Sequence, residues 1–245
     1  MISKKQSKFI KSLKIKKYRD IENAFLIEGK KNVLELIESD FEIERIVCTE
    51  LFADQNPFVF NKNFEVIVST EQELSQLGTF KVNNECLAVA RKRDYPLDKA
   101  DLKGYTFILD DIGDPGNLGT IIRTLDWFGF KHLVCSEHTA DFYNPKVINA
   151  TMGSFTRVRV YYTDIIQLIK QSKKPVFGGD MGGKDLVKTS FPKPSFIVMG
   201  SESAGISSKV RPLLTSTISI RGFGKAESLN VGIATGIICH HLRNY

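Results

Sequence analysis

The chain has 245 residues, of which 42% are hydrophobic and 25% charged, and it carries a formal net charge of +6, so it is an ordinary globular protein of one large or two modest domains. No apolar run approaches the ~20 residues of a transmembrane helix, and the Lys-rich start lacks the apolar core of a secretory signal, so we expect a cytoplasmic protein. The four cysteines lie far apart without a C-x-x-C pair, which argues against a disulfide framework and against a zinc site.

The positive charge is unevenly distributed. Residues 1–19 hold eight Lys/Arg and no acid, whereas residues 20–99 hold nine Lys/Arg against sixteen Asp/Glu. Residues 100–245 hold seventeen Lys/Arg against twelve Asp/Glu. Concentrated positive charge favours a polyanion such as RNA as a partner. A solvated basic tail is the alternative explanation for the first nineteen residues.

Residues 1–95 have the pattern of a small α/β unit. Apolar spacing predicts helices over 4–19, 32–39 and 70–77, and strands over 24–28, 43–49, 64–69 and 86–90. The first of these helices is basic and only partly amphipathic. The charged stretch that follows contains Pro96 and has little periodicity, so we place a linker at 96–103.

Residues 104–245 alternate between strand and helix patterns. Strands are predicted over 105–109, 132–135, 158–161, 175–178, 195–199 and 217–220, and helices over 118–129, 145–154, 164–171 and 228–242. A Gly-rich loop is expected after residue 178. Such alternation is typical of a mostly parallel sheet covered on both faces, so the fold class is α/β.

The helix over 118–129 is the most regular of these elements. Its apolar stripe consists of Leu118, Ile121, Ile122 and Leu125. Asn117 is the predicted N-cap, and Arg123 lies in the first turns, away from the stripe. A cation there opposes the helix dipole, which suggests a role other than local stability.

Three unusual loops, 110–117, 200–207 and 221–230, each follow a predicted strand. Because ligands of parallel sheets bind at the carboxyl ends of the strands, these loops are expected to meet at one rim. The sequence has no phosphate-binding P-loop, dinucleotide fingerprint or hydrolase nucleophile elbow. No histidine lies in or beside the loops, so acid–base chemistry falls to Glu202, Glu227, Arg123 or a substrate group.

The segments around these loops resemble the three motifs of the SpoU/TrmH family, in the family's order and spacing. They read DDIGDPGNLGTIIRTLDWFGF, IVMGSESAGIS and ISIRGFGKAESLNVGIATGI. Members are S-adenosylmethionine-dependent RNA ribose 2′-O-methyltransferases of the SPOUT superfamily. The resemblance implies a SPOUT domain over 104–245 with a C-terminal trefoil knot, S-adenosylmethionine as cofactor, no metal, and a homodimer. Residues 1–95 are similar to the family's ribosomal-protein-like RNA-binding domain, with FLIEGKKNVLEL as the best-matching piece.

The resemblance also implies the site residues. The catalytic positions are Asn117, Arg123, Glu202, Ser228 and Asn230, and the cofactor-binding positions are Leu109, Gly200, Ile220 and Leu229. One departure is the pair Arg221-Gly222, where many members have Pro-Met or Pro-Arg. Because the pKa of a guanidinium is too high for a base, we expect Arg123 to bind a phosphate or the developing alkoxide. Glu202 would orient Arg123 or offset cationic charge, and Ser228 and Asn230 would orient ribose or neighbouring loops.

The expected activity is methyl transfer to a ribose 2′-hydroxyl of ribosomal RNA, ahead of transfer RNA. Two other classes stay open. One is a catalytically inactive RNA-binding module of the SPOUT type. The other is an NAD- or nucleotide-dependent α/β enzyme, which the missing glycine fingerprint disfavours.

Overall fold

A computed structural model describes residues 2–245, apart from the side chain of Lys99, and the chain forms two compact units. The first unit holds the residues up to Arg93 together with 141–156, and the second holds 94–140 and 157–245. Met1, where the predicted first domain begins, lies outside the described residues. None of the described helices is both long and apolar enough to cross a membrane.

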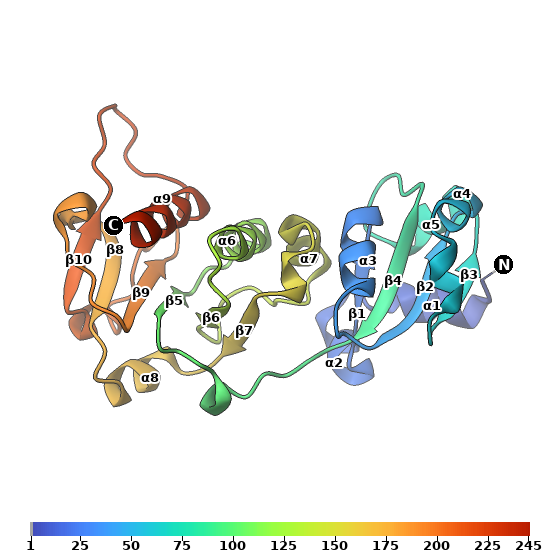
Figure 1. Ribbon diagram of the computed structural model, residues 1–245, viewed down its shortest axis with the longest axis horizontal. Helices are drawn as coiled ribbons and strands as arrows, with labels where there is room; N and C mark the ends of the chain where they lie inside the picture. The colour runs from blue at the N-terminus through green and yellow to red at the C-terminus, as the bar shows by residue number, and fades with distance from the viewer. Residues whose placement is uncertain (1) are drawn as a thin grey trace. The chain divides into compact units, whose positions relative to one another are not determined.

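The first unit is built on a four-stranded sheet with strand order β1-β4-β2-β3 (Figure 1). Strand β4 is antiparallel to β1 and to β2, and β2 is parallel to β3. The elements are α1 (Lys4–Ser12), α2 (Lys16–Glu22), β1 (Ala24–Glu28), α3 (Lys30–Ile37), β2 (Ile43–Cys48), α4 (Glu50–Gln55), η1 (Pro57–Asn61), β3 (Glu65–Val68), α5 (Glu71–Leu77), β4 (Cys86–Arg91), α7 (Pro145–Thr151) and η3 (Ser154–Thr156).

The segment 141–156 is anchored in the first unit by aromatic packing and by an ion pair. The ring of Phe155 lies 6.1 Å from that of Phe25 in β1 and 5.9 Å from that of Phe41. The Arg19 side chain, 2% exposed, donates to Asp141 at 2.5 Å. A buried charge without its partner is costly, so this pair holds the segment in place.

The N-terminal basic stretch forms two helices rather than the single helix predicted. The chain breaks between Ser12 and Lys16, where the carbonyls of Leu13 and Lys14 accept hydrogen bonds from Arg19 Nη1 at 2.9 and 3.0 Å. A buried guanidinium thus takes the acceptors that a continuous helix would use.

The second unit contains a six-stranded sheet of order β10-β8-β9-β5-β6-β7, and every neighbouring pair is parallel. Its elements are η2 (Leu97–Lys99), β5 (Tyr105–Asp110), α6 (Pro115–Trp127), β6 (His132–Cys135), β7 (Arg159–Tyr162), α8 (Ile165–Gln171), β8 (Val176–Asp185), η4 (Leu186–Lys188), β9 (Ser195–Gly200), η5 (Arg211–Leu213), β10 (Ser216–Ser219) and α9 (Val231–Asn244). The predicted α/β class with a parallel sheet is confirmed. The trefoil knot that the resemblance implies stays a prediction.

The two faces of this sheet are covered by different helices. On one face Ile108 and Val198 form a core cluster with Ile165 and Ile169 of α8. Side chains alternate along a strand, so Phe107 points the other way and contacts Phe130, just beyond α6. Helices α6 and α9 pack side by side (Figure 1).

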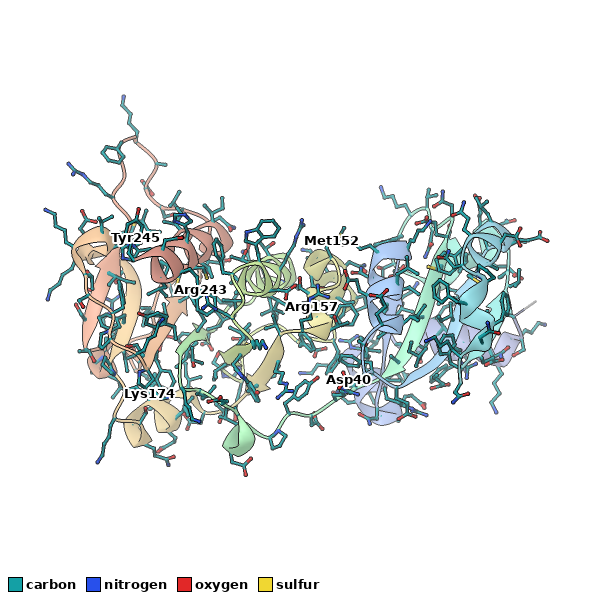
Figure 2. All side chains as sticks on the ribbon, in the orientation of Figure 1. Asp40, Met152, Arg157, Lys174, Arg243 and Tyr245 are labelled. Atoms are coloured by element: carbon teal, nitrogen blue, oxygen red, sulfur yellow. The ribbon has the colours of Figure 1, made fainter. Side chains whose placement is uncertain are left out.

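An arginine near the end of α9 forms hydrogen bonds to the residues that end α6. Arg243, labelled in Figure 2, donates to the carbonyl oxygens of Phe128 at 2.6 Å and Gly129 at 2.8 Å, and its guanidinium lies over the ring of Phe130. Neither carbonyl oxygen accepts a hydrogen bond within α6. The guanidinium on α9 therefore supplies the donors that the C-terminal end of α6 lacks. The contact fixes the relative position of the two helices that carry Asn117 and Asn230.

Strand β8 is longer than predicted, because the Gly-rich stretch continues as strand through Asp185. It pairs with β10 in two stretches, and the register jumps from Thr217 opposite Gly178 to Ile218 opposite Lys184. A Cβ at Gly183 would lie 2.5 Å from the backbone nitrogen of Ile218. Glycine therefore permits close strand pairing here, which the sequence pattern made look like a loop.

Two glycines on α9 offer a matched test of the α6–α9 contact. A Cβ at Gly232 would lie 2.9 Å from Thr120 Cγ2, whereas one at Gly236 would lie 3.7 Å from Thr124 Cγ2. We expect Gly232→Ala to lower the free energy of unfolding by about 1–3 kcal/mol through overpacking. Gly236→Ala is expected to raise it by up to about 1 kcal/mol, since alanine is the better helix former. Denaturant unfolding measures both, and equal effects would argue against the close approach at Gly232.

Candidate active site

The predicted rim lies at the carboxyl ends of adjacent strands of the second unit. Strands β5 and β9 are parallel neighbours, and their last residues, Asp110 and Gly200, face each other in register. The loop after β5 leads into α6, and the loop after β10 leads into α9, which packs against α6. This topology brings the three motif loops together.

A chain of hydrogen bonds joins the three loops through their side chains. Asn230 Oδ1 accepts from the backbone nitrogens of Gly232 at 2.9 Å and Ile233 at 3.4 Å, at the start of α9. Asn230 Nδ2 donates to Asn117 Oδ1 at 2.8 Å. Asn117 Nδ2 in turn donates to Glu202 Oε1.

The helix start sets the direction of this chain. Backbone N–H groups can only donate, so Asn230 must turn its oxygen toward α9 and its nitrogen toward Asn117. Asn117 must then accept from Asn230 and donate to Glu202, which accepts as a carboxylate. Three residues from three loops are therefore held in one defined arrangement.

Asn117 is free for this role because it does not cap α6, contrary to the prediction. The N-cap is Asp114, whose Oδ1 accepts from the backbone nitrogen of Asn117 at 2.8 Å, and Pro115 occupies the first helical position. Aspartate before proline is a strong helix start, because proline has no N–H to leave unsatisfied. The correction moves Asn117 inside the first turn, with its side chain available to the other loops.

The second motif forms a tight turn over Gly200. Ser201 and Gly205 exchange backbone hydrogen bonds at 3.1 and 2.9 Å, and Gly205 adopts a left-handed φ of 63°. A Cβ at Gly200 would lie 2.2 Å from the carbonyl carbon of Gly205. Position 200 therefore requires glycine for the turn to close.

Asp110 is a positioning residue that the sequence analysis missed. Its side chain is 3% exposed, and its Oδ2 accepts from the backbone nitrogen of Ser207 at 2.7 Å. The last residue of β5 thereby holds the second motif loop in position through a hydrogen bond. A signal was present in the sequence, since an acid that directly follows a buried apolar strand needs a partner.

Arg123 lies in the middle of α6 rather than in its first turns, because the helix begins at Pro115. Its side chain is exposed, and it makes no hydrogen bond or ion pair with any described residue. Asp126, a plausible structural partner on the same helix, instead binds Arg157, with Nη2 at 2.9 Å. Glu202 accepts from Asn117, and neither it nor Asp126 forms an ion pair with Arg123 within residues 2–245.

The remaining predicted residues divide between the exposed loop and the core. Residues 221–230 are all exposed; Ser228 has no hydrogen-bond partner within 2–245, and Leu229 is 47% exposed. Ile220 is half-buried directly after β10. The Leu109 side chain is fully buried, and its carbonyl oxygen already accepts from the Ser136 nitrogen at 2.9 Å. The structure thus brings Asn117, Glu202 and Asn230 together, but leaves Arg123 and Ser228 unbonded.

Thiol chemistry and metal ligation find no support in the described part of the chain. Burial raises the pKa of Cys48 to about 11, and it also raises the pKa of Cys86, Cys135 and Cys239. All four are therefore protonated at neutral pH and poor nucleophiles. No group of three or more His, Cys, Asp or Glu side chains among these residues is arranged to hold a metal.

Comparisons with known proteins agree with this geometry. The SpoU rRNA Methylase family matches residues 104–240, and an MRM3-like substrate binding domain matches residues 4–88. The 23S rRNA (guanosine(2553)-2'-O)-methyltransferase RlmP of Bacillus subtilis is 29% identical over an alignment that covers 95% of this chain and 94% of that protein.

Several solved structures match over nearly the whole chain. A putative RNA methyltransferase of the TrmH family from Porphyromonas gingivalis is 33% identical with a TM-score of 0.87, covering 99% of this chain and 98% of that one. An AdoMet-bound rRNA methyltransferase from Sinorhizobium meliloti is 27% identical with a TM-score of 0.88, covering 99% and 96%. The family match spans more than half of the chain and includes all three loops of the rim, so this chain belongs to the SpoU rRNA methylase family.

Proposed function

We propose that the chain is an S-adenosylmethionine-dependent RNA methyltransferase that methylates a ribose 2′-hydroxyl of ribosomal RNA. The observation that carries the proposal is the hydrogen-bonded chain Asn230–Asn117–Glu202, which ties the three family motifs into one site. The names of the relatives from Bacillus subtilis and Sinorhizobium meliloti support the reaction, the ribosomal substrate and the cofactor.

The residues at the rim suit this cofactor. When bound, S-adenosylmethionine supplies an electrophilic methyl group on a sulfonium. The tight turn above Gly200 leaves backbone groups, rather than side chains, at the end of β9, and backbone amides and carbonyls can approach adenosine and methionine closely. Ile220 is half-buried and Leu229 is 47% exposed, so both offer apolar surface to a ligand, and Leu109 is buried in the strand that ends at Asp110.

Methyl transfer to a hydroxyl is an in-line displacement, so the protein must align the acceptor and stabilise the oxygen as its proton leaves. Arg123 is exposed and unpaired among the described residues, and its planar guanidinium can fork onto a phosphate or the developing alkoxide. Asn117, Glu202 and Asn230 hold the three motif loops in one arrangement. Ser228, on the exposed loop, orients the ribose.

The two parts of the chain divide the work. Residues 104–245 supply the SPOUT methyltransferase domain, although their segment 141–156 packs in the first unit; residues 1–95 bind RNA, and 96–103 link the two. The match to an MRM3-like substrate binding domain over 4–88 supports this division. We propose a cytoplasmic location, where ribosomal RNA is abundant.

The enzyme is a homodimer that associates through α6 and α9. Trp127 on α6 is 85% exposed, and Ile233 and Ile237 on α9 are 56% and 37% exposed. Val231, Ile238 and Leu242 of α9 are buried within the unit, so the opposite side of the helix remains available to a partner. Exposed apolar groups on neighbouring helices are typical of an interface. A monomer by light scattering at micromolar concentration would contradict this assignment.

The reaction and the cofactor are tested together. Calorimetry in EDTA should show S-adenosylmethionine binding, and labelled methyl should enter ribosomal RNA from a strain that lacks the gene. Ribose 2′-O-methylation protects the adjacent phosphodiester from alkali, so the product should appear as an alkali-resistant dinucleotide. Methyl on a base would overturn the proposed position. Binding of RNA without any transfer would favour the inactive RNA-binding module instead.

A further inference from the structure

The Lys-rich N-terminus folds into helices α1 and α2 and is not a solvated tail. Helix α1 opens with a capping box, in which Ser3 Oγ accepts from the Gln6 nitrogen at 3.2 Å and Gln6 Oε1 accepts from the Ser3 nitrogen at 2.9 Å. Ile10 and Leu13 are fully buried in a core cluster with Leu74 of α5. The opposite side of α1 is therefore held in a fixed orientation.

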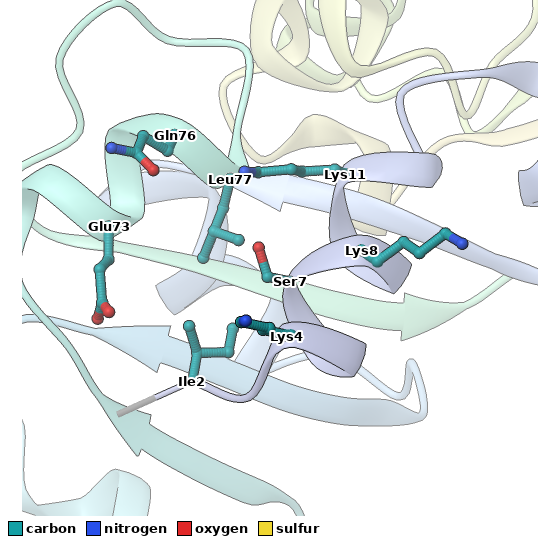
Figure 3. Close-up of a pocket in the computed structure, with 8 residues that line it drawn as sticks. All are labelled: Ile2, Lys4, Ser7, Lys8, Lys11, Glu73, Gln76 and Leu77. Carbon is teal, nitrogen blue, oxygen red and sulfur yellow. The ribbon is translucent and has the colours of Figure 1, made fainter.

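A hollow of about 410 Å³ lies between α1 and α5 (Figure 3). Lys4, Lys8 and Lys11 line it from α1, and Glu73 and Gln76 line it from α5. The three lysines are spaced i, i+4 and i+7, which places them on one helix face over about 10 Å. In Figure 3 the Lys8 stem extends away from α5, and its rotatable bonds let the ammonium follow a bound anion.

The charge of this groove is not neutralised from within. Lys4, Lys8 and Lys11 are exposed and form no ion pair with any residue of the described range 2–245. The carboxylate of Glu73 accepts a hydrogen bond from Ser69, so one acid faces three free cations. By contrast, a second hollow over α3 has two lysines against three glutamates, and Lys30 is 3.8 Å from Glu85 there.

We propose that the α1–α5 groove, lined by Lys4, Lys8 and Lys11, is the surface that binds the phosphodiester backbone of the substrate RNA. The proposal rests on the proposed function, because it takes RNA as the substrate. A row of lysines without paired acids suits a phosphate backbone, whereas lysine is depleted at protein–protein interfaces. The contact supplies affinity and register, and it reads no base.

The test compares two triple variants of the full chain. Lys4, Lys8 and Lys11 are replaced by glutamine in the groove variant. Lys5, Lys16 and Lys17, which are exposed in the same basic segment but do not line the groove, are replaced in the control. Both variants lose the same charge, so an unspecific attraction to RNA weakens equally in both.

Binding to a 23S ribosomal RNA transcript is measured across salt concentrations. The groove variant should lower the slope of log affinity against log salt by about 2, because three phosphate contacts contribute about 0.7 each on a single strand. The control should change the slope by less than about half as much, and Lys→Arg at the three groove positions should preserve it. Melting temperatures verify that all variants are folded.

Equal slope changes in the two variants, or no change in either, would overturn the proposal that the groove binds RNA. Methyl transfer at saturating RNA separates this outcome from failure of the proposed function. The groove variant should recover wild-type turnover there, with only KM raised. If the wild-type chain binds RNA but transfers no methyl group, the proposed function fails and the slopes still decide the groove.

Discussion

Arg123→Ala is expected to slow methyl transfer about 10²–10³-fold while leaving the melting temperature and cofactor affinity near wild-type. Loss of one preorganised electrostatic contact to the developing charge typically has an effect of that size. The structure removes the competing structural role, because Arg123 is exposed and bonds to none of the described residues, while Asp126 binds Arg157. Single-turnover methylation, calorimetry and thermal unfolding measure the three quantities.

Two further variants sharpen this result. Arg123→Lys keeps the charge but loses the planar fork, so it should also be severely impaired. Arg157→Ala is the matched control, since it removes an arginine paired to the same helix, and transfer should stay near wild-type. Near-wild-type transfer by Arg123→Lys would rule out recognition by a guanidinium fork.

Asn117→Asp is expected to slow transfer about 10–100-fold by reversing one link of the hydrogen-bonded chain. The substitution replaces a donor to Glu202 with a second carboxylate, and a hydrogen bond to a charged group contributes about 1.5–3 kcal/mol. The other link survives, because Asn230 Nδ2 still finds an oxygen at position 117. The loss should therefore come from the contact between the first and second motif loops.

Restoring the polarity tests this explanation. In the double variant Asn117→Asp with Glu202→Gln, the amide at position 202 donates to the carboxylate at position 117. We expect transfer to return to within about tenfold of wild-type, with a coupling energy that a double-mutant cycle measures. If the double variant is no faster than Asn117→Asp alone, the charge of Glu202 acts in the reaction itself and positioning is not its role.

Local patterns in the sequence were sufficient for the regular elements. The apolar stripe of α6 is fully buried, as its spacing predicted, and β1 spans Ala24–Glu28 as expected. Periodicity predicts these elements because one side of each must face a core. Some short elements were not predicted. One of them, α4 (Glu50–Gln55), is capped by Thr49 and has too few residues for a periodic signal.

The start of α6 shows why a local pattern places an element better than its boundary. Asn117 and Asp114 are both good capping residues, and the sequence favoured the one next to the apolar stripe. The structure uses Asp114, because proline at the next position is already set for the first helical turn. This difference of three residues decides whether the Asn117 side chain caps α6 or donates to Glu202.

The sequence by itself determined the α/β alternation, the family motifs and the residue types at the rim. Only the tertiary structure decided which of them meet, because Asn117 contacts partners 85 and 113 residues away. It also decided that 141–156 packs in the first unit, through Asp141 on Arg19, and that both ends of a Gly-rich stretch pair with β10. These outcomes depend on which strands are neighbours and how closely backbones approach, and neither quantity is encoded in the spacing of residues along the chain.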